Sequence, residues 1–104
     1  MPEALKIPAH QPTSVGAMLK EEFLEPLGIT QGELAKAMAV GRKTVNELCN
    51  GRRGITAETA FLLGKVLGTG PEFWLNLQMI NDGWLAKHSD ALREKLKRAK
   101  RLVA

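Results

Sequence analysis

Four polar side chains between residues 42 and 47 have the types and the spacing needed to contact DNA bases. On a helix, Arg42, Lys43, Asn46 and Glu47 lie on one side. Arginine or lysine can donate to guanine O6 and N7, asparagine can pair with adenine N6 and N7, and a carboxylate can accept from the cytosine amine. We predict base contacts for these four residues; the alternative is an ordinary solvated helix face.

Two short amphipathic helices joined by a tight turn are expected to position these side chains. Thr30 and Glu33 form a capping box at the start of the first helix. The apolar residues at helical spacing are Leu34, Ala35 and Met38, and, after the turn at 39–41, Val45, Leu48 and Cys49. The segment 28–56 therefore predicts a helix-turn-helix, whose second helix enters the major groove of DNA.

Phosphates of the DNA backbone are the second expected set of contacts. The candidates are Thr30, Gln31, Thr44, Arg52 and Arg53. Thr30 and Gln31 open the first helix of the motif, where side chains and the helix dipole favour an anion; for Thr30 the alternative is simple capping. Arg52 and Arg53 lie in a turn-rich loop past the second helix, which favours phosphates over bases.

Further helices are expected on both sides of the motif. Thr13 or Ser14 caps a helix that should end at Glu25, because proline disfavours helical geometry at the residue before it. Thr56 caps a helix over residues 57–67, which Gly68 ends. The pattern predicts an all-α chain with an arm over 1–12, a helix-turn-helix domain over 13–84 and a basic helical extension over 85–104.

The helix expected after Gly68 is apolar on nearly every side. Residues 69–72, Thr-Gly-Pro-Glu, predict a second capping box with proline in the first turn. A helix with two apolar faces in so small a domain needs two partners, its own core and a second subunit. Trp74, Leu75 and Met79 are the predicted dimer contacts, with burial in the core as the alternative. The segment 81–83, Asn-Asp-Gly, ends this helix or merely weakens it.

The charge of the chain is concentrated in two places. The net charge is +4 over 104 residues, yet residues 87–101 alone carry +5, and the second motif helix with its following loop contributes +3. This polarisation is typical of nucleic-acid-binding proteins. Ser89 is expected to cap a basic helix with a stripe at Leu92, Leu96, Ala99 and Val103. That tail binds phosphates, folds on a partner or keeps the protein soluble, and the pattern leaves the three open.

Chemistry other than binding has little support in this sequence. The single cysteine, Cys49, excludes an intrachain disulfide and is expected to pack in the core. His10 and His88 have no carboxylate or thiol at ligand spacing, so we predict neither a metal site nor a cofactor. No nucleophile, base and orienting group can be assembled, so no enzyme is predicted. No apolar run is long enough for a membrane span or a signal peptide, which predicts a cytoplasmic protein.

The segments EEFLEPLGITQGELAKAM, RKTVNELCNGRRGIT and LGTGPEFWLNLQ resemble the HigA-type (VapI-like) antitoxins of bacteria, within the phage-repressor-like (XRE) helix-turn-helix class. The resemblance runs from about residue 12 to about residue 87. It implies a five-helix domain, a homodimer, and binding to an inverted-repeat operator upstream of the protein's own gene. It also implies a HigB-type toxin partner, a small basic ribonuclease neutralised by direct binding. Glu21, Glu22 and Glu25 are either a solvated cluster or a surface for this basic partner.

Three positions depart from the family pattern. The family usually has Gly-Val-Ser in the turn, where this chain has Ala39, Val40 and Gly41. Ala39 stands where a positive φ is common, at a cost on the order of 1 kcal/mol, and Gly41 loses the usual hydroxyl cap. Glu47 replaces a common basic residue. Two other functions stay open: a stand-alone regulator without a toxin, and a protein-interaction module that has lost DNA binding.

Overall fold

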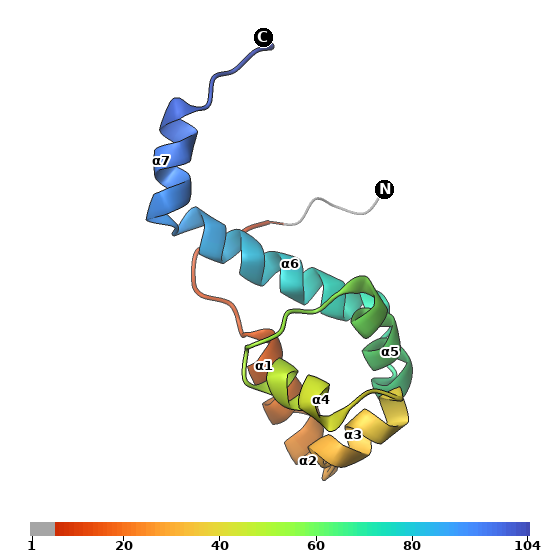
Figure 1. Cartoon of the computed structure of the whole chain (residues 1–104). Coiled ribbons are helices and arrows are strands. Elements are labelled where there is room, and N and C mark those ends of the chain that lie inside the picture. The colour runs from red at the N-terminus through yellow and green to blue at the C-terminus, as the bar shows by residue number, and fades with distance from the viewer. Residues whose placement is uncertain (1–5) are drawn as a thin grey trace.

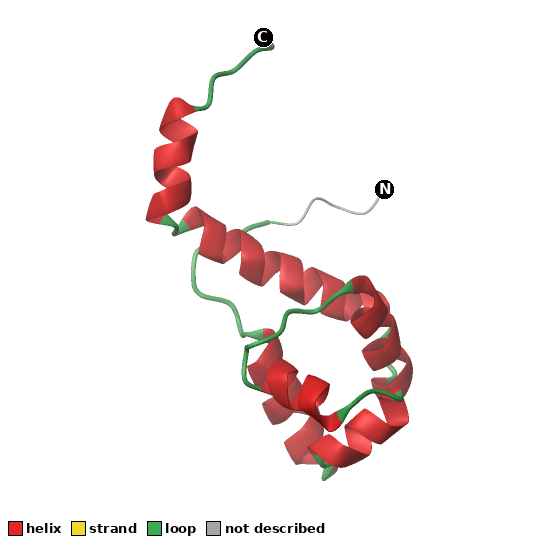
Figure 2. Ribbon diagram, viewed as in Figure 1, coloured by secondary structure: helices red, strands yellow, loops and turns green. Residues whose placement is uncertain are grey.

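The computed structural model describes residues 6–104, which form six helices and, within that range, no strand (Figure 1; Figure 2). The first helix consists of three consecutive segments, α1 (Val15–Ala17), η1 (Met18–Leu24) and α2 (Glu25–Leu27). The others are α3 (Gln31–Met38), α4 (Arg42–Cys49), α5 (Ala57–Leu67), α6 (Pro71–Lys87) and α7 (Asp90–Arg98). The predicted all-α fold, five helices followed by a basic helical extension, is confirmed.

The first helix continues through Pro26, so its predicted end at Glu25 is wrong. Ser14 caps the helix, its hydroxyl accepting from the Ala17 amide at 3.1 Å. In the π-helical segment η1 the backbone bonds reach five residues back, and the Glu25 amide donates to the Lys20 carbonyl. A proline ring in a regular α-helix clashes with the carbonyl four residues earlier. The wider π turn before Pro26 relieves that clash, and the helix ends at Gly28, whose φ is 66°.

The hydrophobic core gathers residues from each of the first five helices and from the loop after α4. Its buried residues are Val15, Leu19, Leu24, Leu34, Ala35, Met38, Val45, Leu48, Cys49, Ile55, Ala60, Leu63 and Trp74. The stripes predicted for the two motif helices are therefore confirmed. They place the back of α4 in the core and leave its polar side in solvent.

Trp74 is fully buried within the chain, so its predicted place in a dimer interface is wrong. Its ring packs against Phe23 and Phe73, with centroids 5.3 and 5.0 Å away. The indole nitrogen donates to the Thr69 hydroxyl at 2.9 Å. The Thr69 hydroxyl accepts from Trp74 and donates to the Gly70 carbonyl, and it makes no capping bond to α6. The capping box predicted at 69–72 therefore does not form. Pro71 does occupy the first turn of α6.

Helix α6 passes through Asn81, Asp82 and Gly83 without a break. The side-chain Nδ2 of Asn81 donates to the backbone carbonyl of Thr13 and to that of Leu77, both at 2.9 Å. The arm before the first helix thus lies against α6. Since α6 ends at Lys87, it crosses the predicted boundary at residue 84, and the division into 13–84 and 85–104 stays a prediction. Residues 1–5 of the predicted arm lie outside the described residues.

Beyond α6, helix α7 extends away from the other helices (Figure 1). The predicted cap is present, with the Ser89 hydroxyl accepting from the Leu92 amide at 3.1 Å. The apolar stripe stops early, however, because Ala99 is extended and residues 99–104 are not helical. No residue of α7 is buried, so there is no packing to extend a helix that ends in a run of cations. No helix within residues 6–104 is long and apolar enough to cross a membrane.

Gly16 allows the first helix to approach the end of α4 closely. A Cβ atom at this position would lie 2.5 Å from the Cys49 carbonyl oxygen and 2.9 Å from that of Leu48. Both neighbours are backbone atoms and cannot rotate away. The first helix therefore fixes the position of α4 through a contact that only glycine permits.

We expect Gly16→Ala to lower the free energy of unfolding by about 1–3 kcal/mol, since the added methyl group must push the two helices apart. Gly32→Ala is the matched control, because a Cβ there meets only the Thr30 hydroxyl at 3.9 Å. It should stabilise α3 by about 0.5–1 kcal/mol. Chemical denaturation of both variants measures the difference, and equal stabilities would contradict the close approach.

Ala39 adopts a left-handed conformation, with a φ of 58°. We expect Ala39→Gly to stabilise the protein by up to about 1 kcal/mol, because glycine avoids the steric cost that alanine carries there. Ala37→Gly, at an exposed position inside α3, should instead destabilise the protein by about 0.5–1 kcal/mol. Thermal unfolding distinguishes the two, and a loss of stability in both would contradict a strained turn.

Candidate nucleic-acid interface

Helices α3 and α4 and the turn between them form the predicted helix-turn-helix. The Thr30 amide donates to the Glu33 carboxylate at 2.9 Å, and the Glu33 amide donates to the Thr30 hydroxyl at 3.0 Å, so the predicted capping box is present. The bond from the Thr30 amide favours the charged carboxylate and is the main cause that holds the pKa of Glu33 below its ordinary value. Gly41 occupies the N-cap of α4 without a side-chain bond, as expected from its lack of a hydroxyl.

The predicted base-contacting residues lie on the solvent side of α4. Arg42, Lys43 and Asn46 are exposed, and Glu47 is half-buried. Among the predicted phosphate contacts, Thr30, Arg52 and Arg53 are exposed, whereas Gln31 and Thr44 are half-buried. The Thr30 hydroxyl accepts the capping bond and still holds a proton to donate. The structure thus gathers the predicted residues around the start of α3, the outer side of α4 and the loop after it.

Asn46 is held in place from both sides by other amide side chains. Its Nδ2 donates to Gln31 Oε1 at 3.1 Å, and Asn50 Nδ2 donates to Asn46 Oδ1 at 3.1 Å. Each amide nitrogen has a second hydrogen and each carbonyl oxygen a second lone pair, so Asn46 keeps one donor and one acceptor for an adenine edge. Gln31 was predicted only as a phosphate contact, and Asn50 was not predicted as a site residue. Its i, i+4 spacing from Asn46 is the signal that identifies it.

Glu47 and Arg53 form an ion pair between α4 and the loop. Arg53 donates to Glu47 Oε1 through Nε at 3.1 Å and through Nη2 at 2.8 Å. The Arg53 guanidinium is the main cause that holds the pKa of Glu47 below its ordinary value. The pair neutralises the carboxylate that would otherwise repel phosphates from α4. It also engages one of the two loop arginines, and among residues 6–104 Arg52 takes part in no ion pair.

Two of the three predicted dimer contacts, Leu75 and Met79, are at least partly exposed to solvent. Met79 is 62% exposed, whereas Leu75 is partly buried against the core. Phe73 and Leu85 of α6 are also exposed. A subunit interface through Leu75 and Met79 therefore stays a prediction.

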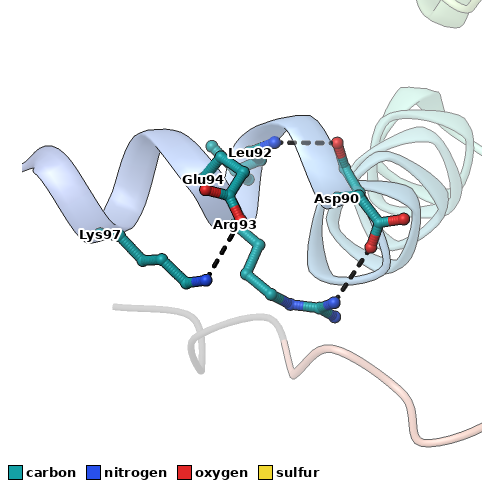
Figure 3. A network of polar contacts seen from close by, with 6 residues as sticks. Asp90, Leu92, Arg93, Glu94 and Lys97 are labelled. Atoms are coloured by element: carbon teal, nitrogen blue, oxygen red, sulfur yellow. Dashed lines mark hydrogen bonds and ion pairs between the residues drawn. The ribbon is translucent and has the colours of Figure 1, made fainter.

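Two of the four cations of α7 form ion pairs within the helix. Arg93 binds Asp90 at 3.0 Å and Lys97 binds Glu94 at 3.1 Å (Figure 3).

The acidic residues Glu21, Glu22 and Glu25 are exposed on the first helix. Cys49 is buried, which raises the pKa of its thiol. In the described part of the chain, no group of three His, Cys, Asp or Glu residues could hold a metal ion.

Known proteins share both the sequence and the fold of this chain. A family model described as helix-turn-helix matches residues 20–74. Antitoxin HigA-1 of Vibrio cholerae is 55% identical over 75 residues, which cover 72% of this chain and 70% of that protein. A solved structure of Pseudomonas aeruginosa antitoxin HigA with its higBA promoter is 32% identical, covers 89% of this chain and 99% of the solved one, and has a TM-score of 0.75.

A third relative is antitoxin GraA, solved in complex with its operator. It is 38% identical to this chain, covers 91% of it and 95% of its own length, and has a TM-score of 0.81. The family model spans the capping box, both motif helices, the loop after them and α5. The chain therefore belongs to the HigA-type antitoxins of the helix-turn-helix family.

Proposed function

We propose that this chain is a sequence-specific DNA-binding antitoxin that represses its own operon as a homodimer in the bacterial cytoplasm. The observation that carries the proposal is the outer side of α4. Arg42, Lys43 and Asn46 are exposed there above a buried apolar back, and Asn46 is oriented by Gln31. Relatives with the same fold have been solved on operator or promoter DNA. In a dimer, two such helices would lie about 34 Å apart and contact two half-sites of an inverted repeat.

We also propose that the protein neutralises a HigB-type ribonuclease toxin by direct binding. Membership of the antitoxin family and the 55% identity to HigA-1 support this partner. The alternative is a stand-alone regulator without a toxin, a function consistent with the relatives named only as transcriptional regulators. Co-expression with the product of the neighbouring gene discriminates between the two: an antitoxin forms a stoichiometric complex with it, and a stand-alone regulator does not.

Selection of the protein on a random DNA duplex pool at near-physiological salt tests the DNA-binding proposal. We expect enrichment of an inverted repeat with half-sites one helical turn apart. Arg42→Ala should weaken binding to the enriched duplex by about 1–3 kcal/mol, because a guanine contact is lost, and should leave toxin binding unchanged.

Lys36→Ala is the matched control, since it removes one exposed cation from α3 outside the predicted contacts. It should leave the enriched sequence unchanged. An equal loss for Arg42→Ala on operator and random DNA would show that Arg42 contacts phosphate instead of a base. No enrichment by the unaltered protein would contradict the proposal.

A further inference from the structure

We propose that Gln78 of α6 is a positioning residue for DNA binding, because it sets the loop that carries Arg52. The inference rests on the proposed function. It starts from a hydrogen bond between two segments that lie far apart in the sequence: the Ile55 amide donates to Gln78 Oε1 at 2.6 Å. Ile55 belongs to the loop segment NGRRGIT and Gln78 to the helix segment PEFWLNLQ.

The loop between α4 and α5 is held at both of its ends. At its beginning, the Arg52 amide donates to the Glu47 carbonyl at 2.9 Å, and Gly51 turns the chain with a φ of 73°. At its end, the bond from Ile55 to Gln78 fixes the backbone as it enters the core, where Ile55 is buried. Arg52 lies between these two points, and its direction depends on both.

Gln78 is itself fixed by its neighbours. Its Nε2 donates to Asp82 Oδ1 at 2.9 Å, one turn further along α6. A Cβ on Gly54 would lie 3.3 Å from Gln78 Oε1, so the loop backbone runs directly over the amide. Gln78 and Arg52 also line the same open cleft, of about 380 Å³. The Gln78 amide thus joins α6 to the loop, close to Arg52. Of the two loop arginines, Arg52 is the one that takes part in no ion pair among the described residues.

The role of Arg52 follows from what Arg53 already does. Arg53 neutralises Glu47, so Arg52 is the loop cation left to meet a DNA phosphate. A long side chain on a mobile loop loses conformational freedom when it binds. A loop held at both ends avoids part of that loss. Removing the acceptor of Gln78 should therefore remove the benefit of Arg52, even though Gln78 makes no DNA contact of its own.

A double-mutant cycle on the selected operator duplex tests this role. We expect Gln78→Ala and Arg52→Gln each to weaken operator binding about tenfold, and the double variant to be no weaker than either single variant. Each should also lower the slope of log affinity against log salt by about 0.9 per chain, the value for one lost phosphate contact. Asn76→Ala, an exposed residue on the same helix, is the control and should change neither quantity.

A charge-neutral exchange separates positioning from simple folding. Gln78→Glu combined with Asp82→Asn keeps an acceptor for the Ile55 amide and reverses the bond between the two side chains. This pair should restore the unaltered salt slope even if Gln78→Ala unfolds. Full additivity in the cycle, or a lowered slope in the folded exchange pair, would overturn the inference. If the unaltered protein selects no operator, the proposed function fails; if it does and the cycle is additive, only the role of Gln78 fails.

Discussion

The contact between the first helix and the end of α4 determines most of what this structure can do. At Gly16 the two backbones approach so closely that a single methyl group would meet the Cys49 carbonyl oxygen. This approach, with Val45 and Leu48 fully buried behind it, fixes the distance and the rotation of α4. Because the back of α4 is held so tightly, its front can consist entirely of polar groups that have no role in the core.

The polar groups around α4 are ordered before any DNA is present. Gln31 and Asn50 hold the Asn46 amide, and Arg53 holds the Glu47 carboxylate. Exposed pairs such as these contribute little to stability, in the range of about 0–1 kcal/mol each. Their value lies in reducing the number of side-chain conformations that must be lost on binding. The stability of the fold thus comes from the apolar core, whereas the amide and ion-pair contacts at the surface set the orientation of the polar side chains on α4.

Local signals in the sequence predicted the motif well. The capping box at Thr30 and Glu33, the bounds of α5 and the buried stripe of α4 all depend on residues within one or two turns of each other. Most residues avoid the left-handed conformation of Ala39, and the family pattern, which places glycine there, predicts it.

 The φ of Ala39, 58°, confirms that expectation. The capping box, the bounds of α5 and the stripe of α4 could therefore be read from the chain alone, whereas the conformation of Ala39 required the family pattern.

The errors arise where another group competes for a side chain or where the backbone departs from a regular helix. Thr69 has the spacing of a cap, but the indole of Trp74 takes its hydroxyl once the core forms. Pro26 has the local signature of a helix end, but the π turn before it allows the helix to continue. The roles of Gln31 toward Asn46 and of Gln78 toward Ile55 depend on contacts across 15 and 23 residues. No periodicity or capping rule contains such contacts, so they require the folded structure.

The central claim is that the outer side of α4 contacts base edges in the major groove, and methylation interference tests it most directly. Dimethyl sulfate adds a methyl group to guanine N7 in the major groove and to adenine N3 in the minor groove. We expect methylated guanines in both half-sites to block binding, and Arg42→Ala to become insensitive to them, because the arginine that would meet N7 is gone. Interference confined to adenine N3, or the same guanine pattern in the variant, would contradict the claim.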